Sequence, residues 1–238
     1  MSCPESSMPL RLLPSCVAIL IAVHALPLLA MQAPTVRTNA DTAHARSSVH
    51  ARSTSRACDW EAEATPGHRD SVRTALQPMV LLVDGMSGAS GVDAASRQAA
   101  LDLLRRAERP LPLGSIAGNW KVRSIQVHGA DARPGFDFAY AYPYFKAAIQ
   151  RKGACGYRFA KTSGSQRRTG MLYPMAESRN ELAFLGAATV NNDPAREYDP
   201  RGDAEHASVG RLLRTGRNEL LLILDAQPTR FELYQLRR

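Results

Sequence analysis

The stretch ASVGRLLRTGRNELLLILDAQPTRFELYQL, residues 207–236, decides the fold of this 238-residue chain. It contains three short runs, 207–214, 219–224 and 230–236, in which apolar residues alternate with polar ones or follow one another directly. Residues 215–218 form a short turn between the first two runs. Short runs that are separated by turn residues are typical of β strands. Residues 207–236 therefore predict three consecutive strands.

Similar runs precede this stretch, so we expect about eight strands in all. The earlier runs cover 120–127, 144–150, 156–162, 170–173 and 181–190. About eight strands close a small up-and-down barrel, whose interior either is packed or holds one small ligand. The predicted fold class is therefore mostly β, with an eight-stranded antiparallel barrel. Its first strand changes its apolar face between Val122 and Ile125, which predicts a bulge or a sharp bend.

Two helices are expected before the barrel. A Thr-Pro pair at residues 65–66 is typical of a helix start, and apolar residues then recur at helical spacing. Pro78 is expected to kink or end this helix. Asp93 can cap a second helix that continues to about Glu108. The run 181–190 is apolar on both faces, so we expect the helices to cover its outer side.

Residues 1–31 are predicted to be a signal peptide. Arg11 precedes an apolar run over 12–30 that two prolines interrupt, and small residues follow. The alternative is a membrane anchor, although the run is barely long enough to span a bilayer. Residues 32–57 are rich in Ala, Ser, Thr and Arg, which predicts a disordered linker. Residues 58–238 are then one helix-capped domain, located in the periplasm or secreted.

Cys58 and Cys155 are the two cysteines that remain after removal of the signal peptide. In an oxidising compartment two such cysteines are expected to form a disulfide. Two unpaired thiols are the alternative, because sequence spacing does not show whether the side chains are close.

The formal net charge of +8 does not predict nucleic-acid binding, because the basic residues are scattered among acidic ones rather than grouped. A basic surface can attract an anionic membrane or a polyanion, and a solvated face is the simpler interpretation. The sequence predicts no cofactor, no metal site, no catalytic residues and no membrane span after signal cleavage.

The segment Gly118-Asn119-Trp120 resembles the G-x-W motif of lipocalins. In that family the tryptophan begins the first strand and closes the floor of the barrel, and a basic residue of the last strand packs across its ring. The resemblance implies a lipocalin-like barrel in which Trp120 is structural and Arg237 or Arg230 stacks on it. The second lipocalin motif, T-D-Y, is replaced here by Arg-Thr-Gly at 214–216.

Over a longer span the chain is similar to a family of exported bacterial proteins known only as a domain of unknown function. The resemblance rests on residues 58–60, 157–167, 170–174 and 184–186. It implies an exported location and a shared architecture, and it implies no activity.

The best candidate for a binding loop lies between two predicted strands, where hydroxyls, glycine and basic side chains are dense. Backbone N–H groups and guanidinium groups in such a loop can hold a carboxylate or a phosphate, whereas a solvated hairpin is the simpler interpretation. The candidate ligand-binding residues are Lys161, Ser163, Ser165, Arg167, Arg168 and Tyr144. Tyrosines 140, 142 and 144 with Phe145 can line a cavity, stack on sugars or pack in the core.

These observations favour a non-enzymatic exported barrel that binds a small apolar or anionic ligand, or a protein partner in the cell envelope. The alternative is an envelope hydrolase whose cleft lies by the loop 161–168, with Lys161, Arg167 and His206 together. Residues 199–206 gather three carboxylates and a histidine, which suit a cation or acid–base chemistry but also an ordinary solvated loop. The sequence shows no paired nucleophile and base.

Overall fold

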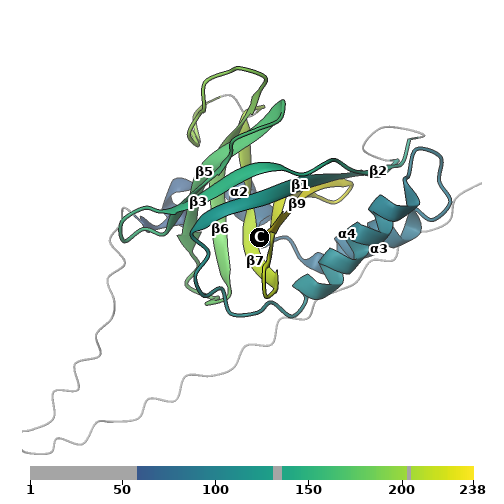
Figure 1. Cartoon of the computed structure of the whole chain (residues 1–238), viewed down its shortest axis with the longest axis horizontal. Coiled ribbons are helices and arrows are strands. Elements are labelled where there is room, and N and C mark those ends of the chain that lie inside the picture. Colours follow the sequence, from purple (N-terminus) through teal and green to yellow (C-terminus); the bar gives the residue numbers. More distant parts are fainter. Residues whose placement is uncertain (1–57, 131–135, 203–204) are drawn as a thin grey trace, which may run out of the picture. The chain divides into compact units, whose positions relative to one another are not determined.

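The computed structural model describes residues 58–130, 136–202 and 205–238. The predicted signal peptide, 1–31, and the predicted linker, 32–57, lie outside the described residues. Four helices precede nine strands in the described part of the chain (Figure 1). The helices are α1 (Trp60–Glu63), α2 (Pro66–Arg73), α3 (Leu76–Gly85) and α4 (Ala94–Ala107). The strands are β1 (Gly118–His128), β2 (Phe138–Ala141), β3 (Phe145–Arg151), β4 (Tyr157–Lys161), β5 (Gln166–Pro174), β6 (Glu181–Val190), β7 (Ala207–Gly216), β8 (Glu219–Gln227) and β9 (Arg230–Arg237).

Eight of the strands close into an antiparallel barrel, as the sequence predicts. Each strand from β3 to β9 pairs with the next one, and β1 pairs with both β3 and β9 to complete the ring. The short strand β2 is additional and was not predicted, because four residues are too few to show a period. It pairs with the far end of β1, which extends together with β9 beyond the barrel (Figure 1).

The predicted change of apolar face in β1 is present, but the bulge that it suggested is absent. Its pairing with β9 runs without a shift from Lys121 opposite Arg237 to His128 opposite Arg230. Trp120 and Val122 face the barrel interior, whereas Ile125 lies in the outer apolar cluster beneath the helices. The side chains of β1 alternate regularly between its two faces. The inward face is buried near Trp120, and the outward face is buried near Ile125.

The interior of the barrel is packed with apolar side chains at the end that holds Trp120. Trp120 is 3% exposed, and Phe159 and Phe184 are fully buried with their rings in an edge-to-face arrangement. Gly186 faces the same interior, where a Cβ would lie 2.4 Å from the Phe184 ring. The rest of this cluster consists of Ile116, Val122, Ala147, Ile149, Leu172, Leu182, Leu212, Leu220, Leu222, Leu224, Tyr234 and Leu236.

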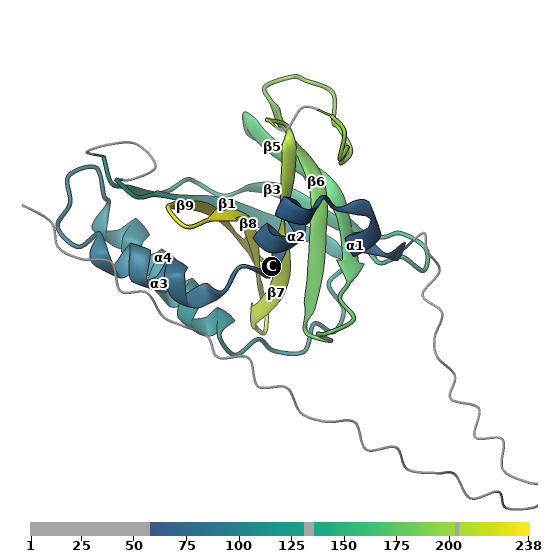
Figure 2. The ribbon, with the colours of Figure 1, turned by 180° about the vertical axis from the view of Figure 1, so that it is seen from behind.

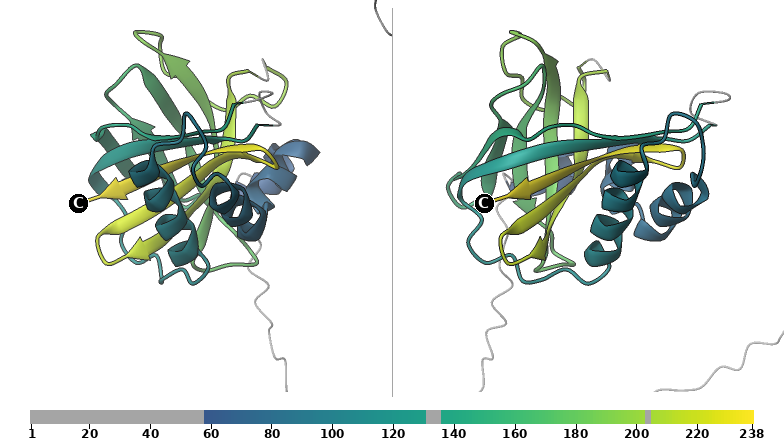
Figure 3. Two further views of the ribbon diagram at one scale, coloured as in Figure 1. Left: turned by 90° about the vertical axis from the view of Figure 1, so that its right-hand side faces the viewer. Right: turned by 45° about the vertical axis from the view of Figure 1, so that its right-hand side comes forward.

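Two pairs of helices cover the outside of the barrel. The short pair, α1 and α2, packs on β5, β6 and β7 through Trp60 and Val72, and α2 also contacts β8 (Figure 2). The longer pair, α3 and α4, packs on the extension of β1, β2 and β9 (Figure 3). The outer side of β6 is therefore covered by helices, as expected, although α1 and α2 alone supply that cover.

The first predicted helix is divided into α2 and α3 at Thr74 and Ala75, so Pro78 neither kinks nor ends it. Pro78 lies in the first turn of α3, where a backbone N–H has no partner within the helix and its absence costs nothing. Helix α4 begins where the sequence predicts, because the Asp93 side chain accepts a hydrogen bond from the Ser96 N–H at 2.7 Å.

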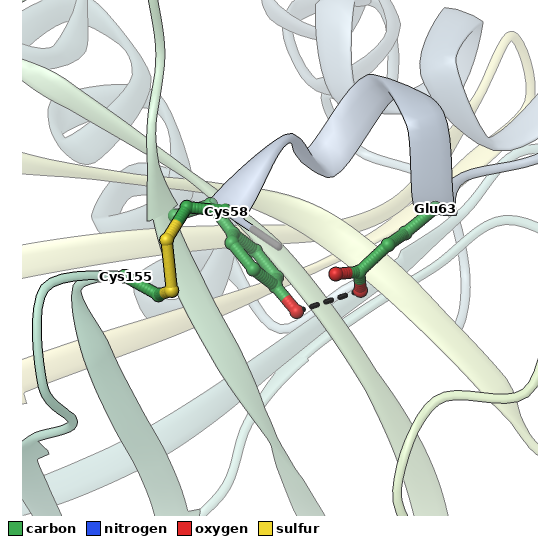
Figure 4. The surroundings of a disulfide bond; sticks show 4 residues. Cys58, Glu63 and Cys155 are labelled. Atoms are coloured by element: carbon green, nitrogen blue, oxygen red, sulfur yellow. Dashed lines mark hydrogen bonds between the residues drawn. A yellow bond between two sulfur atoms is a disulfide. The ribbon is translucent and has the colours of Figure 1, made fainter. Parts of the chain in front are cut away.

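The predicted disulfide between Cys58 and Cys155 is present (Figure 4). It joins Cys58, two residues before α1, to the turn between β3 and β4, across 97 positions of sequence. Nearby, the Tyr173 hydroxyl donates a 2.7 Å hydrogen bond to Glu63 of α1. Burial and this carboxylate raise the pKa of Tyr173 above its ordinary value. The helix is thus held to the barrel at both of its ends.

Glu219 at the start of β8 joins α4 to the outer wall of the barrel. Its carboxylate accepts hydrogen bonds from Thr215 at 2.9 Å and from the fully buried Gln235. Arg106 of α4 and Arg237 of β9 each lie 3.0 Å from it. Burial alone would raise the pKa of Glu219, but these donors outweigh it and lower the pKa.

Replacing Glu219 by glutamine should destabilise the domain by about 1–3 kcal/mol at neutral pH, because charge-assisted hydrogen bonds are lost. Since the folded-state pKa is lowered, the contribution is complete above the ordinary pKa of glutamate and disappears as the pH falls through the lowered value. Urea unfolding of both proteins at several pH values should show their difference shrinking in acid. The exposed Glu108→Gln serves as the control, and a difference that is constant with pH would contradict the assignment.

Candidate binding cleft at the barrel mouth

A cleft of about 820 Å³ opens at the end of the barrel opposite Trp120, which we call the mouth. At this end β5 and β7 begin and the β8–β9 hairpin turns. Helix α2 forms one wall and the extension of β1 forms another. The lining residues that matter below are Gln126, His128, Arg168, Asp225 and Glu232.

The floor of the cleft is a buried ion-pair cluster around Arg168. Its Nη2 atom donates to Glu232 at 2.9 Å and lies 3.7 Å from a carboxylate oxygen of Asp225. The side chains of Arg168 and Glu232 are only 14% and 8% exposed. Burial alone would lower the pKa of Arg168, but the Glu232 and Asp225 carboxylates raise it, so the guanidinium stays charged.

Hydroxyl groups hold this cluster in one orientation. Ser208 accepts a 2.9 Å hydrogen bond from Nε of Arg168 and donates a 3.0 Å hydrogen bond to Asp225. Ser124 donates to the other oxygen of Glu232. The backbone N–H of Val209 donates to Asp225 at 2.9 Å. Each charged group of the floor therefore has a fixed position relative to the cleft above it.

Lys161 and Tyr234 lie between this floor and the apolar interior. The ammonium of Lys161 is 4.8 Å from the centre of the Phe145 ring and 5.5 Å from that of Tyr234. Burial lowers the pKa of Lys161, and Glu232 partly offsets this. The Tyr234 hydroxyl is fully buried and has no hydrogen-bond partner among the residues that the structure describes. Two cations, Lys161 and Arg168, thus balance the two carboxylates of the floor.

One wall of the cleft carries a row of uncharged polar groups. The Gln126 side chain donates to that of Gln166 at 2.9 Å, and the Tyr142 hydroxyl lies 3.3 Å from the Gln126 amide oxygen. Beside them the His128 ring is 5.9 Å from the ring of Phe138. Burial and the nearby Arg230 lower the pKa of His128, which favours the neutral imidazole.

The structure separates the residues of the predicted binding loop. Lys161 and Arg168 point into the barrel, where Arg168 forms the floor of the cleft. Arg167 lies on the other face of β5 and donates to the backbone carbonyl of Asn191. The Ser163 hydroxyl accepts the Lys146 N–H at 2.8 Å, and the Ser165 carbonyl accepts the Asn191 N–H at 2.6 Å.

Tyr144 lies outside the barrel, where its hydroxyl donates to Gln235 at 2.9 Å and Arg123 packs on its ring. None of the three residues of the alternative hydrolase interpretation lines the cleft at the mouth. Of the three, only His206 contributes to the second cleft, which measures about 220 Å³. Across the described ranges no three His, Cys, Asp or Glu side chains are placed to hold a metal ion.

Sequence reasoning missed Asp225, Glu232, Gln126 and His128. A signal for Glu232 is present, because it shares the inward face of β9 with the buried Tyr234 and Leu236. A charged residue on an otherwise apolar face is rarely buried without a partner. The partner, Arg168, comes from a strand 64 positions away, so no local pattern pairs them.

Trp120 is buried as the G-x-W resemblance implies, but the arginine on its ring is Arg238 rather than Arg237 or Arg230. The Arg238 guanidinium carbon lies 4.2 Å from the ring centre. Successive residues of β9 point to opposite faces, so Arg237 turns outward to Glu219. Arg230 lies at the mouth, at the far end of the strand.

No helix in the described ranges combines the length and the apolar character that a membrane span needs. Comparison of the chain with curated proteins and with solved structures gave no significant match. Nothing in these comparisons supports the resemblance to lipocalins. The model of a domain of unknown function, DUF4893, matches residues 60–236, from α1 to the last strand of the barrel. The chain therefore belongs to the DUF4893 family, which confirms the longer of the two resemblances.

Proposed function

We propose that the domain binds a small polar molecule in the cleft at the barrel mouth. The observation that carries this proposal is the Arg168–Glu232–Asp225 cluster at the floor of an open cleft. A buried ion pair adds little net stability, because the loss of hydration offsets most of the attraction between the charges. At the floor of a cleft the same groups supply oriented donors and acceptors for a ligand.

The filling of the barrel favours a polar ligand over an apolar one. The apolar half of the interior is occupied by its own side chains, among which Phe159, Phe184 and Leu222 are fully buried. The open space instead lies above charged and amide groups. A ligand of the cleft must therefore form hydrogen bonds with these polar groups rather than fill an apolar cavity.

We also propose that the chain is exported to the periplasm or the cell exterior. The order of charged, apolar and small residues in 1–31 supports export. The Cys58–Cys155 disulfide supports it independently, because such bonds persist in oxidising compartments.

A thermal-shift screen of amino acids, dicarboxylates and sugars tests the binding proposal. At least one compound should raise the melting temperature of the full chain, and Gln126→Ala should reduce that shift because Gln126 lines the cleft. Gln98→Ala removes the same side chain from the exposed face of α4 and should leave the shift unchanged. A screen without any shift, or equal effects of the two variants, would refute the proposal.

A further inference from the structure

Three aromatic side chains, Phe138 and Tyr140 of β2 and Tyr142 just after it, form a row beside the cleft. The ring centres of Phe138 and Tyr140 are 6.3 Å apart, and those of Tyr140 and Tyr142 are 5.1 Å apart. Tyr140 is 44% exposed although it is a large aromatic residue. We call these three side chains the aromatic row.

The aromatic row lies on the same face of the sheet as the cleft. Gln126 of β1 is paired with Tyr140 on one side and with Glu232 on the other. Directly paired residues of antiparallel strands point to the same face. Glu232 of the floor, Gln126 of the polar wall and Tyr140 of the aromatic row therefore lie on one line across three strands. Two strand spacings separate its ends, or about 10 Å.

The opposite face of the same strands is fully covered. Ala139 of β2 and Val127 of β1 are buried in the cluster beneath α3 and α4. The backbone of β2 is also engaged on its outer edge, where the Ala139 carbonyl accepts the Asp93 N–H at 3.1 Å and Ser96 accepts the Ala141 N–H at 2.8 Å. An added strand is therefore not the partner that this edge admits, and the side chain of Tyr140 is the large aromatic surface that remains exposed there.

We propose that the ligand of the mouth cleft is a saccharide of at least two sugar units, one in the cleft and the next on the aromatic row. This inference rests on the binding function proposed above. A pyranose presents an apolar C–H face that packs on an aromatic ring and a rim of hydroxyls that donate and accept hydrogen bonds. Glu232 and Tyr140 are separated by two strand spacings, or about 10 Å. Two linked sugar rings span about this distance.

The groups of the cleft fit the hydroxyl rim of a sugar. Gln126, Glu232 and Arg168 keep capacity for a ligand beyond the contacts described above, because a guanidinium has five N–H donors, a carboxylate about four acceptor sites and an amide two donors and two acceptor sites. The charges of the floor balance one another, so a neutral ligand leaves no uncompensated charge beneath it. A carboxylate or a phosphate would instead approach Glu232 and Asp225, which line the cleft with Arg168.

Isothermal titration of the full chain with chitotriose, cellotriose and maltotriose, and with the corresponding monosaccharides, tests this assignment. At least one trisaccharide should bind more tightly than its monosaccharide. Tyr140→Ala should weaken trisaccharide binding by about 5- to 10-fold, because a ring contact is lost, and should change monosaccharide binding far less. Tyr144→Ala is the matched control, since Tyr144 is a comparably exposed tyrosine outside the row.

The outcomes separate the two proposals. If amino acids or carboxylates bind in the cleft and no sugar does, the saccharide assignment fails and the binding function stands. If nothing binds, both fail. Trisaccharide binding that is equal in Tyr140→Ala and in the native chain would overturn the role of the aromatic row. Unchanged thermal unfolding of Tyr140→Ala confirms that the variant is folded.

Discussion

Replacing Trp120 by alanine should lower the free energy of unfolding by about 3–5 kcal/mol, because a large core side chain leaves a cavity. The ring is 3% exposed, and its Nε1 donates a 2.9 Å hydrogen bond to the Ile116 carbonyl, which would lose its donor. Such a loss is a large part of the stability of an ordinary domain. Urea unfolding followed by circular dichroism measures it. A change below about 1 kcal/mol would mean that this end of the barrel is not packed as described.

Arg238 provides a second test of the same site. The substitution Arg238→Ala should cost about 1 kcal/mol, since the cation–π contact is partly exposed. The two substitutions should be non-additive in a double-mutant cycle, because the side chains are in contact. The exposed Arg105→Ala serves as the control for loss of an arginine and should be additive with Trp120→Ala. Additivity of Arg238→Ala would contradict the stacking.

Loss of the disulfide is the second large expected effect. Closure of a loop of 97 positions stabilises the folded state by about 4–5 kcal/mol in the chain-entropy model, and strain reduces that figure. Cys155→Ser should therefore lower the melting temperature of the oxidised protein by many degrees. The bond anchors α1, whose Trp60 packs on β5 and β6.

Reduction supplies the control for this prediction. A reducing agent should lower the melting temperature of the native chain to that of the double variant Cys58→Ser, Cys155→Ser, and should not affect the double variant. Peptide mapping of protein purified from its host without reduction should recover the two cysteines in one cross-linked peptide. Two free thiols in that sample would contradict both the bond and the proposal of export.

The sequence alone determined where most strands and helices lie, because these depend on local patterns. The continuous apolar run over 181–190, the pattern over 230–236 and the cap at Asp93 involve contacts within a few residues, and the structure agrees with each. The break between α2 and α3 was placed wrongly, because Pro78 is unfavourable inside a helix but acceptable in its first turn. The sequence around Pro78 is compatible with both positions, the interior of a long helix and the first turn of a new one.

Only the tertiary structure decided which faces are buried and which polar groups meet. The sequence placed Ile125 and Val122 on opposite faces of one strand, and the packing of α3 and α4 showed that the face of Ile125 is the outer one. Lys161 and Arg168 were found as basic residues of one loop, but their partners Glu232 and Asp225 come from the other side of the barrel. Which residues meet across a closed sheet depends on the register and the twist of every strand between them. A charge cluster or a cleft formed in this way therefore has no signature in any single stretch of the chain.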